Sequence, residues 1–275
     1  MSDEQLDWND FWRDHSNDPL AFIDDPQTWS HIGWKVGLEE WHDRFRQYAP
    51  GNTLLECGCG TATLSRYMTQ RNFKCTMLDS SKKAIEIAKA GFAARSLSGT
   101  FCVGDIKHIE FEDNSFDIVY SGGVLEFLED IEKPIAEMVR VLKPGGFFAV
   151  SMVPRKFSIQ TIGDLQRTAA HFIQNIAVGK FKGSFKGMHL VPSNYHVNNF
   201  PLSRYVKSCQ EAGLVNVKGL NSSPFPALAL PDSLSKSYAR FLYSNINTWR
   251  KFNELSSSGW RRWVGITYTL YGTKD

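Results

Sequence analysis

Short apolar runs alternate with helical patterns between residues 50 and 152, and this alternation limits the fold more than any other feature of the chain. Five runs have the length and apolar content of buried strands, at 53–55, 74–78, 100–103, 116–120 and 147–152. Continuous apolar strands joined by helices predict a parallel sheet that helices cover on both faces. The sequence therefore predicts an α/β, doubly wound fold.

The residues that follow these strands are the first candidates for function. In a doubly wound sheet, ligands bind outside the carboxyl ends of the strands, close to the first strand. These positions are residues 56–62, Asp79, Asp105 and residues 121–123. We expect them to meet at one edge of the sheet.

Three segments outside this alternation are expected to be additions to the sheet. Residues 1–49 are rich in tryptophan and predict an N-terminal helical cap, while residues 50–275 predict the main domain. Within that domain, insertions are expected at about 155–200 and 227–258. A helix is predicted from Pro201 to Gly213, and strands are predicted at about 215–217 and 263–271.

The composition is that of an ordinary globular protein, with 42% hydrophobic and 22% charged residues among 275. No window approaches the roughly 18 apolar residues of a membrane helix. Residues 1–5 are acidic where a secretion signal would be basic. The chain has only five cysteines, and an odd, small number does not indicate a disulfide framework. We therefore expect a cytoplasmic protein without a membrane span.

A glycine-containing turn follows the first strand, in Leu-Leu-Glu-Cys-Gly-Cys-Gly-Thr-Ala at 54–62. Gly58 and Gly60 permit a sharp turn and a close approach to a ligand. Glu56 offers a carboxylate at the strand tip. The segment resembles motif I of the class I S-adenosylmethionine-dependent methyltransferases. Its rival is a dinucleotide-binding turn, but the third glycine of that motif would be Thr63 here.

Four later segments extend the resemblance in the same order. Asp79 ends the second strand, where a carboxylate can accept both hydroxyls of a ribose. Asp105 and Ile106 follow the third strand, where this class holds and covers the adenine. Residues 116–128 resemble the fourth motif, and residues 141–148 resemble the "LKPGG" turn into the fifth strand. The nearest likeness is to small-molecule enzymes such as the ubiquinone and menaquinone biosynthesis methyltransferases.

The resemblance implies a seven-stranded, mostly parallel, Rossmann-like sheet whose last strand is antiparallel. It implies S-adenosylmethionine as cofactor and S-adenosylhomocysteine as product. The residues that it assigns to the cofactor are Glu56, Gly58, Gly60, Thr61, Asp79, Ser80, Gly104, Asp105, Ile106, Ser121 and Gly122.

Three positions depart from the family pattern. Ala62 replaces the third glycine of motif I, a small change that the helix start should tolerate. Phe127 occupies the place of a histidine in the fourth motif, so no catalytic histidine is carried over there. Residues 121–123 read Ser-Gly-Gly instead of the Asn/Asp-Pro-Pro-Tyr/Phe of enzymes that methylate amino groups of bases or glutamine, which argues against methylation of nucleic-acid amino groups.

Several residues also have a purely structural interpretation. Cys57 and Cys59 fit as small turn residues, because no second pair of metal-ligating residues lies near them. Asp79 could cap the following helix, but Ser80 could do this as well, so ligand contact is favoured. Asp117 lies inside a strand and is expected to be structural. Glu126 is compatible with either a structural or a functional role.

Methyl transfer from a sulfonium needs no acid for the leaving group, whereas an alcohol, phenol or carbon acceptor needs a base. Among five candidates we favour His31 and His189, because covering segments usually supply the acceptor pocket in this class. The full set of candidates is His31, His171, His189, Tyr195 and His196.

Two basic stretches bear on the acceptor. Residues 155–190 and 236–262 each carry six basic side chains against one acid. We expect a lid formed by residues 1–49 and both insertions, with a basic rim that prefers a small acceptor bearing a carboxylate or phosphate. Methylation of RNA or protein, a catalytically silent cofactor-binding module and a nicotinamide-linked dehydrogenase are the alternatives. The protein is expected to be a monomer or a homodimer.

Overall fold

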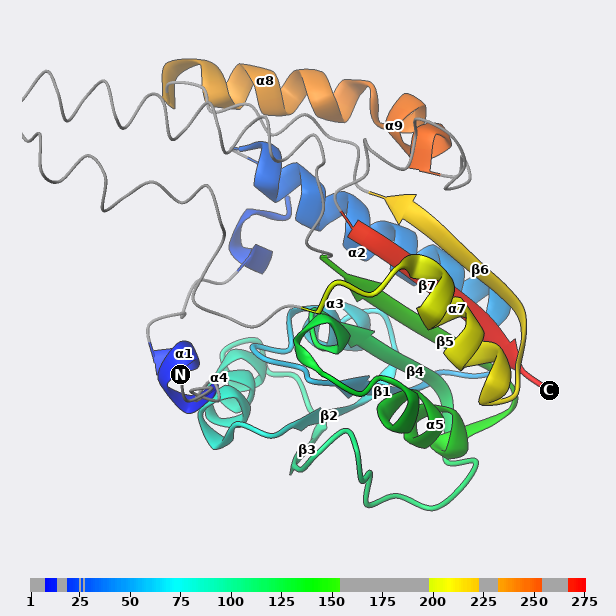
Figure 1. Ribbon diagram of the computed structural model, residues 1–275. Coiled ribbons are helices and arrows are strands. Elements are labelled where there is room, and N and C mark those ends of the chain that lie inside the picture. The colour runs from blue at the N-terminus through cyan, green and yellow to red at the C-terminus, as the bar shows by residue number, and fades with distance from the viewer. Residues whose placement is uncertain are drawn as a thin grey trace, which may run out of the picture.

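The structure is a computed structural model that describes residues 8–13, 19–24, 26, 28–153, 198–222, 232–253 and 267–275. Within these residues a single sheet has the strand order β3-β2-β1-β4-β5-β7-β6 (Figure 1). The strands are β1 (Thr53–Cys57), β2 (Lys74–Asp79), β3 (Thr100–Val103), β4 (Phe116–Gly122), β5 (Leu142–Met152), β6 (Leu214–Ser222) and β7 (Thr267–Lys274).

The direction of the strands agrees with the fold expected from the motifs. The five strands from β1 to β5 pair in parallel, and β7 is antiparallel to both of its neighbours, β5 and β6. The α/β, mostly parallel, seven-stranded sheet is therefore confirmed.

Helices cover both faces because each central strand is apolar on both sides. Leu54 and Ile118 face a core formed with α2 (Trp29–Tyr48), α3 (Thr63–Thr69) and α4 (Lys82–Ala93). Their neighbours Leu55 and Val119 face the opposite core, formed with α5 (Glu132–Val141) and α7 (Leu202–Glu211). Burial on both faces explains why these strands read as continuous apolar runs.

Most predicted boundaries agree with the structure to within a few residues, but the fifth and sixth strands are longer than predicted. The fifth strand begins at Leu142, because Leu142 pairs with Phe116 before the register shifts and Phe147 pairs with Ile118. The Lys-Pro-Gly-Gly sequence that ends α5 thus lies inside β5 as an irregularity.

The N-terminal segment contains α1 (Trp8–Arg13), a 3-10 turn η1 (Pro19–Phe22) and the long helix α2. The expected second insertion contains α8 (Asp232–Ser244) and α9 (Ile246–Asn253). Figure 1 shows α8 lying alongside α2. A small separate core joins these two helices through Ile32, Val36, Ala239 and Leu242. The helix expected in the first insertion lies outside the described residues.

Asp117 has the structural role that its position inside a strand predicts. Its Oδ2 accepts hydrogen bonds from the backbone N–H and the hydroxyl of Thr53, at 3.0 and 2.6 Å. Its Oδ1 accepts a hydrogen bond from Lys143 Nζ at 2.9 Å. Burial alone would raise the pKa of Asp117, but the hydrogen bonds from Lys143 and Thr53 lower it. The side chain ties the start of β4 to β1 and β5.

None of the described helices is both long enough and apolar enough to cross a membrane.

Candidate functional site

The carboxyl ends of β2, β1 and β4 lie side by side. β1 is paired in parallel with β2 on one side and with β4 on the other, so the strand order reverses at β1. This is the switch point at which doubly wound sheets bind ligands. The structure therefore brings the turn after β1 next to Asp79 and Ser121, as the sequence predicts.

The turn after β1 has a left-handed backbone at three positions. Gly58, Gly60 and Ala62 have φ angles of 66°, 51° and 54°. The backbone N–H groups of Gly58 and Cys59 both donate to the carbonyl of Leu78, at 2.7 and 3.0 Å. A Cβ at Gly58 would collide with the side chain of Val124, so only glycine fits there. The turn is therefore held tightly against β2.

Glu56 is a buried carboxyl at the tip of β1. Its Oε2 accepts hydrogen bonds from the hydroxyl and the backbone N–H of Ser65, at 2.5 and 3.1 Å. Burial raises the pKa of Glu56 to about 7, although the hydrogen bonds from Ser65 partly oppose this shift. A buried carboxyl of this kind gains from a cationic partner, because a positive charge favours its ionised form.

Asp79 connects the tips of two strands. Its Oδ2 accepts a 2.8 Å hydrogen bond from the backbone N–H of Gly60, and its Oδ1 accepts one of 2.9 Å from Ser81. Burial raises its pKa, opposed by these two hydrogen bonds. The cap of α4 is Ser81, whose hydroxyl accepts from the N–H of Ala84 at 3.1 Å. Neither Asp79 nor Ser80, the two residues weighed as possible caps, is therefore the N-cap of this helix.

The remaining residues assigned to the cofactor differ in exposure. Asp105 is exposed, and its Oδ1 accepts from the N–H of Lys107 at 2.9 Å, while Ile106 is buried beside it. Gly104 N–H donates to the carbonyl of Asp79 at 3.0 Å, which holds the third strand tip against the second. Ser121 is buried, and its hydroxyl donates to the carbonyl of Cys57 at 2.9 Å.

Helix α1 contacts these strand tips, on the side where the sequence predicts that residues 1–49 form part of a lid. A Cβ at Gly60 would come within 2.6 Å of the Trp12 ring. The side-chain oxygen of Asn9 accepts from the hydroxyl of Ser81 at 2.9 Å. The ring of Trp8 meets Phe127 edge-on, with 5.2 Å between centroids. Trp8 and Trp12 thus pack against residues of the first and fourth motifs.

Glu126 is a second buried carboxyl near these strand ends. It lies in the 3-10 turn η2 (Leu125–Phe127) after β4, and its Oε1 accepts from the N–H of Val153, after β5, at 2.9 Å. Its Oε2 is buried and has no hydrogen-bond partner among the residues that the structure describes. Burial raises the pKa of Glu126 to about 7. The sequence left its role open, because nothing local distinguishes a buried glutamate from one on a helix surface.

The candidate bases are only partly described. His31 lies in the first turn of α2, half-buried, and burial lowers its pKa. His171, His189, Tyr195 and His196 lie outside the described residues.

Cys57 and Cys59 are buried, and burial raises the pKa of both thiols. Among the described parts of the chain, no three histidine, cysteine, aspartate or glutamate side chains gather as metal ligands would.

Comparisons with known proteins identify the central part of the chain. Residues 55–150 match a family described as "Methyltransferase domain". A malonyl-[acyl-carrier protein] O-methyltransferase from Serratia marcescens is 33% identical over 115 residues, which are 42% of this chain and 43% of the relative. A demethylmenaquinone methyltransferase from Desulfitobacterium hafniense is 36% identical over 102 residues, 35% of this chain and 40% of the relative. The chain thus spans less than half the length of these curated relatives.

Solved structures agree on the fold. A SAM-dependent methyltransferase from Aquifex aeolicus superposes with a TM-score of 0.53 at 14% identity, covering 94% of this chain and 100% of the other. One from Thermotoga maritima gives 0.51 at 18% identity, covering 93% and 97%. The family match falls on the residues that carry the five motifs, so the resemblance drawn from the sequence is confirmed.

Proposed function

Because residues 55–150 belong to a methyltransferase-domain family, we propose that this chain transfers a methyl group from S-adenosylmethionine to an oxygen or nitrogen atom of a small molecule. The observation that carries the proposal is the position of two buried carboxyls, Glu56 and Asp79, at adjacent strand tips beside a turn with two left-handed glycines. Carboxylates at these positions suit an ammonium and a ribose.

The described residues fit such a cofactor. Glu56 would accept the amino group, since a cation compensates the burial of its carboxylate. Asp79 would accept the ribose hydroxyls. Asp105 and Ile106 would hold and cover the adenine. The complete set proposed to bind the cofactor is Glu56, Gly58, Gly60, Thr61, Asp79, Ser80, Gly104, Asp105, Ile106, Ser121 and Gly122.

The bound cofactor supplies an electrophilic methyl group on a positively charged sulfur. The chain has to align an acceptor with that methyl group and to exclude water. The N-terminal cap and the two insertions are proposed to form the cover. The contacts of α1 with the strand tips support this role for the N-terminal cap. His31 and His189 are proposed as bases for an acceptor that must lose a proton.

The acceptor is proposed to carry a carboxylate or phosphate. The basic stretches at 155–190 and 236–262 favour an anion. Two relatives have names that fit a small-molecule or carrier-bound acceptor, those given for malonyl-[acyl-carrier protein] and demethylmenaquinone. If changing Lys180, Lys182 and Lys186 to glutamate left the acceptor KM unchanged, this electrostatic preference would be refuted.

The test of the reaction uses methyl-labelled S-adenosylmethionine with a panel of small carboxylic acids, phenols and amines, and with RNA and protein in parallel. We expect label in a small-molecule product. Label in RNA or protein would favour the macromolecular alternative. Cofactor binding without transfer to any acceptor in the panel would favour a catalytically silent module.

A further inference from the structure

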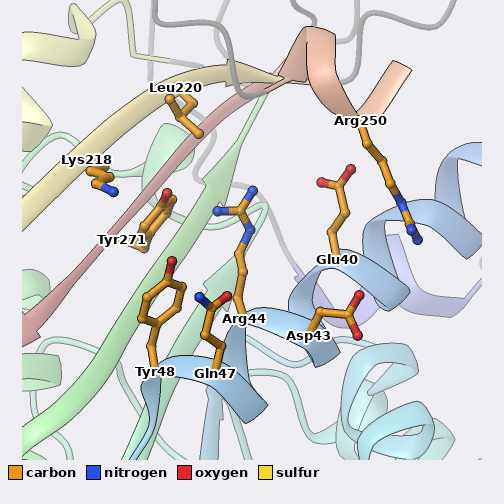
Figure 2. Close-up of a pocket in the computed structure, with 9 residues that line it drawn as sticks. All are labelled: Glu40, Asp43, Arg44, Gln47, Tyr48, Lys218, Leu220, Arg250 and Tyr271. Carbon is orange, nitrogen blue, oxygen red and sulfur yellow. The ribbon is translucent and has the colours of Figure 1, made fainter. Parts of the chain in front are cut away.

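A polar pocket lies away from the strand tips, beside strands β6 and β7. It has a volume of about 390 Å³ and lies between α2, α9, the edge strand β6 and its neighbour β7 (Figure 2). Tyr271, in its wall, pairs with Ala149 in the middle of β5. Figure 1 shows α9 and β6 on the side of the molecule opposite to α1. The pocket is therefore separate from the proposed cofactor site.

The centre of the pocket is the guanidinium group of Arg44. Its central carbon lies 4.8 Å from the centroid of the Tyr271 ring and 5.9 Å from that of Trp41. Figure 2 shows the group between Tyr271 and Glu40. Within the described part of the chain, no carboxylate forms an ion pair with Arg44, although Glu40 and Asp43 lie on the same helix. The half-buried guanidinium thus contacts two aromatic rings and has no ion-pair partner among the described residues.

Two further cations line the same space. Lys218, on β6, is exposed and forms no ion pair with any described residue. Arg250, on α9, donates from Nη2 to Glu39 at 2.8 Å, and its buried Nε has no hydrogen-bond partner among the described residues. Arg250 is therefore already paired with a carboxylate. Arg44 and Lys218, in contrast, offer donors that no described carboxylate pairs with.

The wall also supplies hydroxyl groups and a flat apolar surface. Tyr48 and Tyr271 lie nearly parallel, with an interplanar angle of 24° and 6.4 Å between centroids. In Figure 2 both hydroxyl groups point to the same side as the Arg44 guanidinium. Leu220 adds an apolar contact. Basic groups next to tyrosine hydroxyls and ring faces suit an oxyanion attached to a flat apolar group.

We propose that this pocket binds a small organic anion, with its carboxylate or phosphate group at Arg44 and Lys218. The lining also holds the acidic side chains of Glu40 and Asp43, but among the described residues neither forms an ion pair with Arg44 or Lys218. Asp43 is also partnered by His42 Nδ1, at 3.3 Å. The inference does not depend on the proposed methyl transfer, since it uses none of the same residues.

Calorimetric titrations of the full chain with benzoate, phenyl phosphate and benzyl alcohol test the proposal at constant ionic strength. Benzoate and phenyl phosphate carry the two oxyanions on the same ring, and the alcohol lacks the charge. We expect saturable binding of at least one anion in the millimolar range or tighter, and weaker binding of the alcohol. Saturating S-adenosylhomocysteine should not displace the anion.

Three variants locate the site. Arg44→Met should weaken anion binding by about tenfold or more, because it removes a charge-assisted hydrogen bond while keeping a long side chain. Lys218→Met tests the same site if Arg44→Met fails to fold, because Lys218 is exposed and its replacement should not disturb the core. Arg46→Met is the matched control, since Arg46 is exposed on the same helix but does not line the pocket.

Three results would overturn the proposal. The first is no saturable binding of either anion to the natural chain. The second is an equal loss of binding in Arg46→Met and in the pocket variants. The third is displacement of the anion by S-adenosylhomocysteine, which would place it in the cofactor site.

Discussion

The backbone N–H of Gly60 donates a 2.8 Å hydrogen bond to Oδ2 of Asp79, joining the turn after β1 to the tip of β2. The carboxylate proposed to bind the ribose therefore also holds the glycine turn in place. The other carboxylate oxygen of Asp79, Oδ1, accepts a 2.9 Å hydrogen bond from the backbone N–H of Ser81. Cofactor binding and the shape of the turn should consequently depend on one side chain.

Replacing Asp79 by asparagine should weaken S-adenosylhomocysteine binding by about tenfold or more, because charge-assisted hydrogen bonds are lost. The free energy of unfolding should fall by about 1–2 kcal/mol, since an amide nitrogen must then face a backbone N–H. Calorimetric titration and urea denaturation measure the two effects.

The matched control is Asp117→Asn. Asp117 also accepts backbone and side-chain hydrogen bonds, but at the start of β4, remote from the proposed site. The Asp117→Asn variant should lower the free energy of unfolding by a similar amount and leave the affinity for S-adenosylhomocysteine unchanged. Equal losses of affinity in both variants would mean that Asp79 acts only through general stability.

The raised pKa of Glu56 predicts how stability depends on pH. Its pKa rises from 4.5 to about 7 on folding, so the folded protein binds more protons than the unfolded one between these values. The contribution of Glu56 therefore becomes less favourable as the pH rises from about 4.5 to 7, by on the order of 3 kcal/mol. Glu56→Gln should raise the free energy of unfolding at pH 8 and change it little at pH 5.

Denaturation of Glu56→Gln at both pH values tests this, with Glu86→Gln as the control on the exposed face of α4. The control should show no pH-dependent gain. A Glu56→Gln protein that is less stable than the natural chain at pH 8 would contradict the burial argument.

Cofactor affinity should show the opposite trend with pH. A bound ammonium favours the ionised form of Glu56, so the affinity should rise from pH 6 towards pH 7, by up to about tenfold per pH unit. Titrations with S-adenosylhomocysteine over this range measure it. In Glu56→Gln the affinity should depend much less on pH. If the affinity of that variant changed with pH as steeply as that of the natural chain, the titrating group would be one other than Glu56.

Ala62 has a φ of 54° at the start of α3, a conformation that costs a residue with a side chain about 1–2 kcal/mol. Ala62→Gly relieves this cost and adds backbone entropy to the unfolded chain, so it should be neutral or stabilising by up to about 1 kcal/mol. Ala88→Gly, inside α4, should destabilise by about 1 kcal/mol or more. Equal destabilisation by both changes would contradict the strained conformation.

The contact of Trp12 with Gly60 predicts a fluorescence signal. S-adenosylhomocysteine should change the intrinsic tryptophan emission, because the indole covers the turn that the ligand approaches. Trp12→Phe should remove most of that change. Trp34→Phe, on the exposed surface of α2, should retain it. A full signal in Trp12→Phe would show that α1 does not cover the ligand.

The strands and the acidic tips could be predicted because their signals are local. The runs at Leu54 and Ile118 are apolar on both faces, and the glycines of the turn mark its position directly. A charged residue inside a strand, Asp117, could be assigned a structural role for the same reason. For these inferences it was enough to know the type of each residue and its position relative to a strand.

A cover that includes residues 1–49 was expected, but the residues through which it contacts the turn could not be predicted, and neither could the pocket beside α2. Both depend on contacts between distant parts of the chain. Trp12 meets Gly60 across 48 residues, and helical spacing alone does not indicate which surface an aromatic residue packs on. Arg44, Lys218 and Arg250 come from three separate elements. Likewise, the choice of Ser81 over Ser80 as helix cap depends on backbone angles that neighbouring serines do not distinguish.

Calorimetric titration of S-adenosylhomocysteine into the natural chain and into Asp79→Asn tests the central claim most directly. The account predicts saturable binding at one site per chain, weakened by about tenfold or more in the variant. Absence of heat and of any thermal shift with the natural chain, or equal affinity for both proteins, would contradict it.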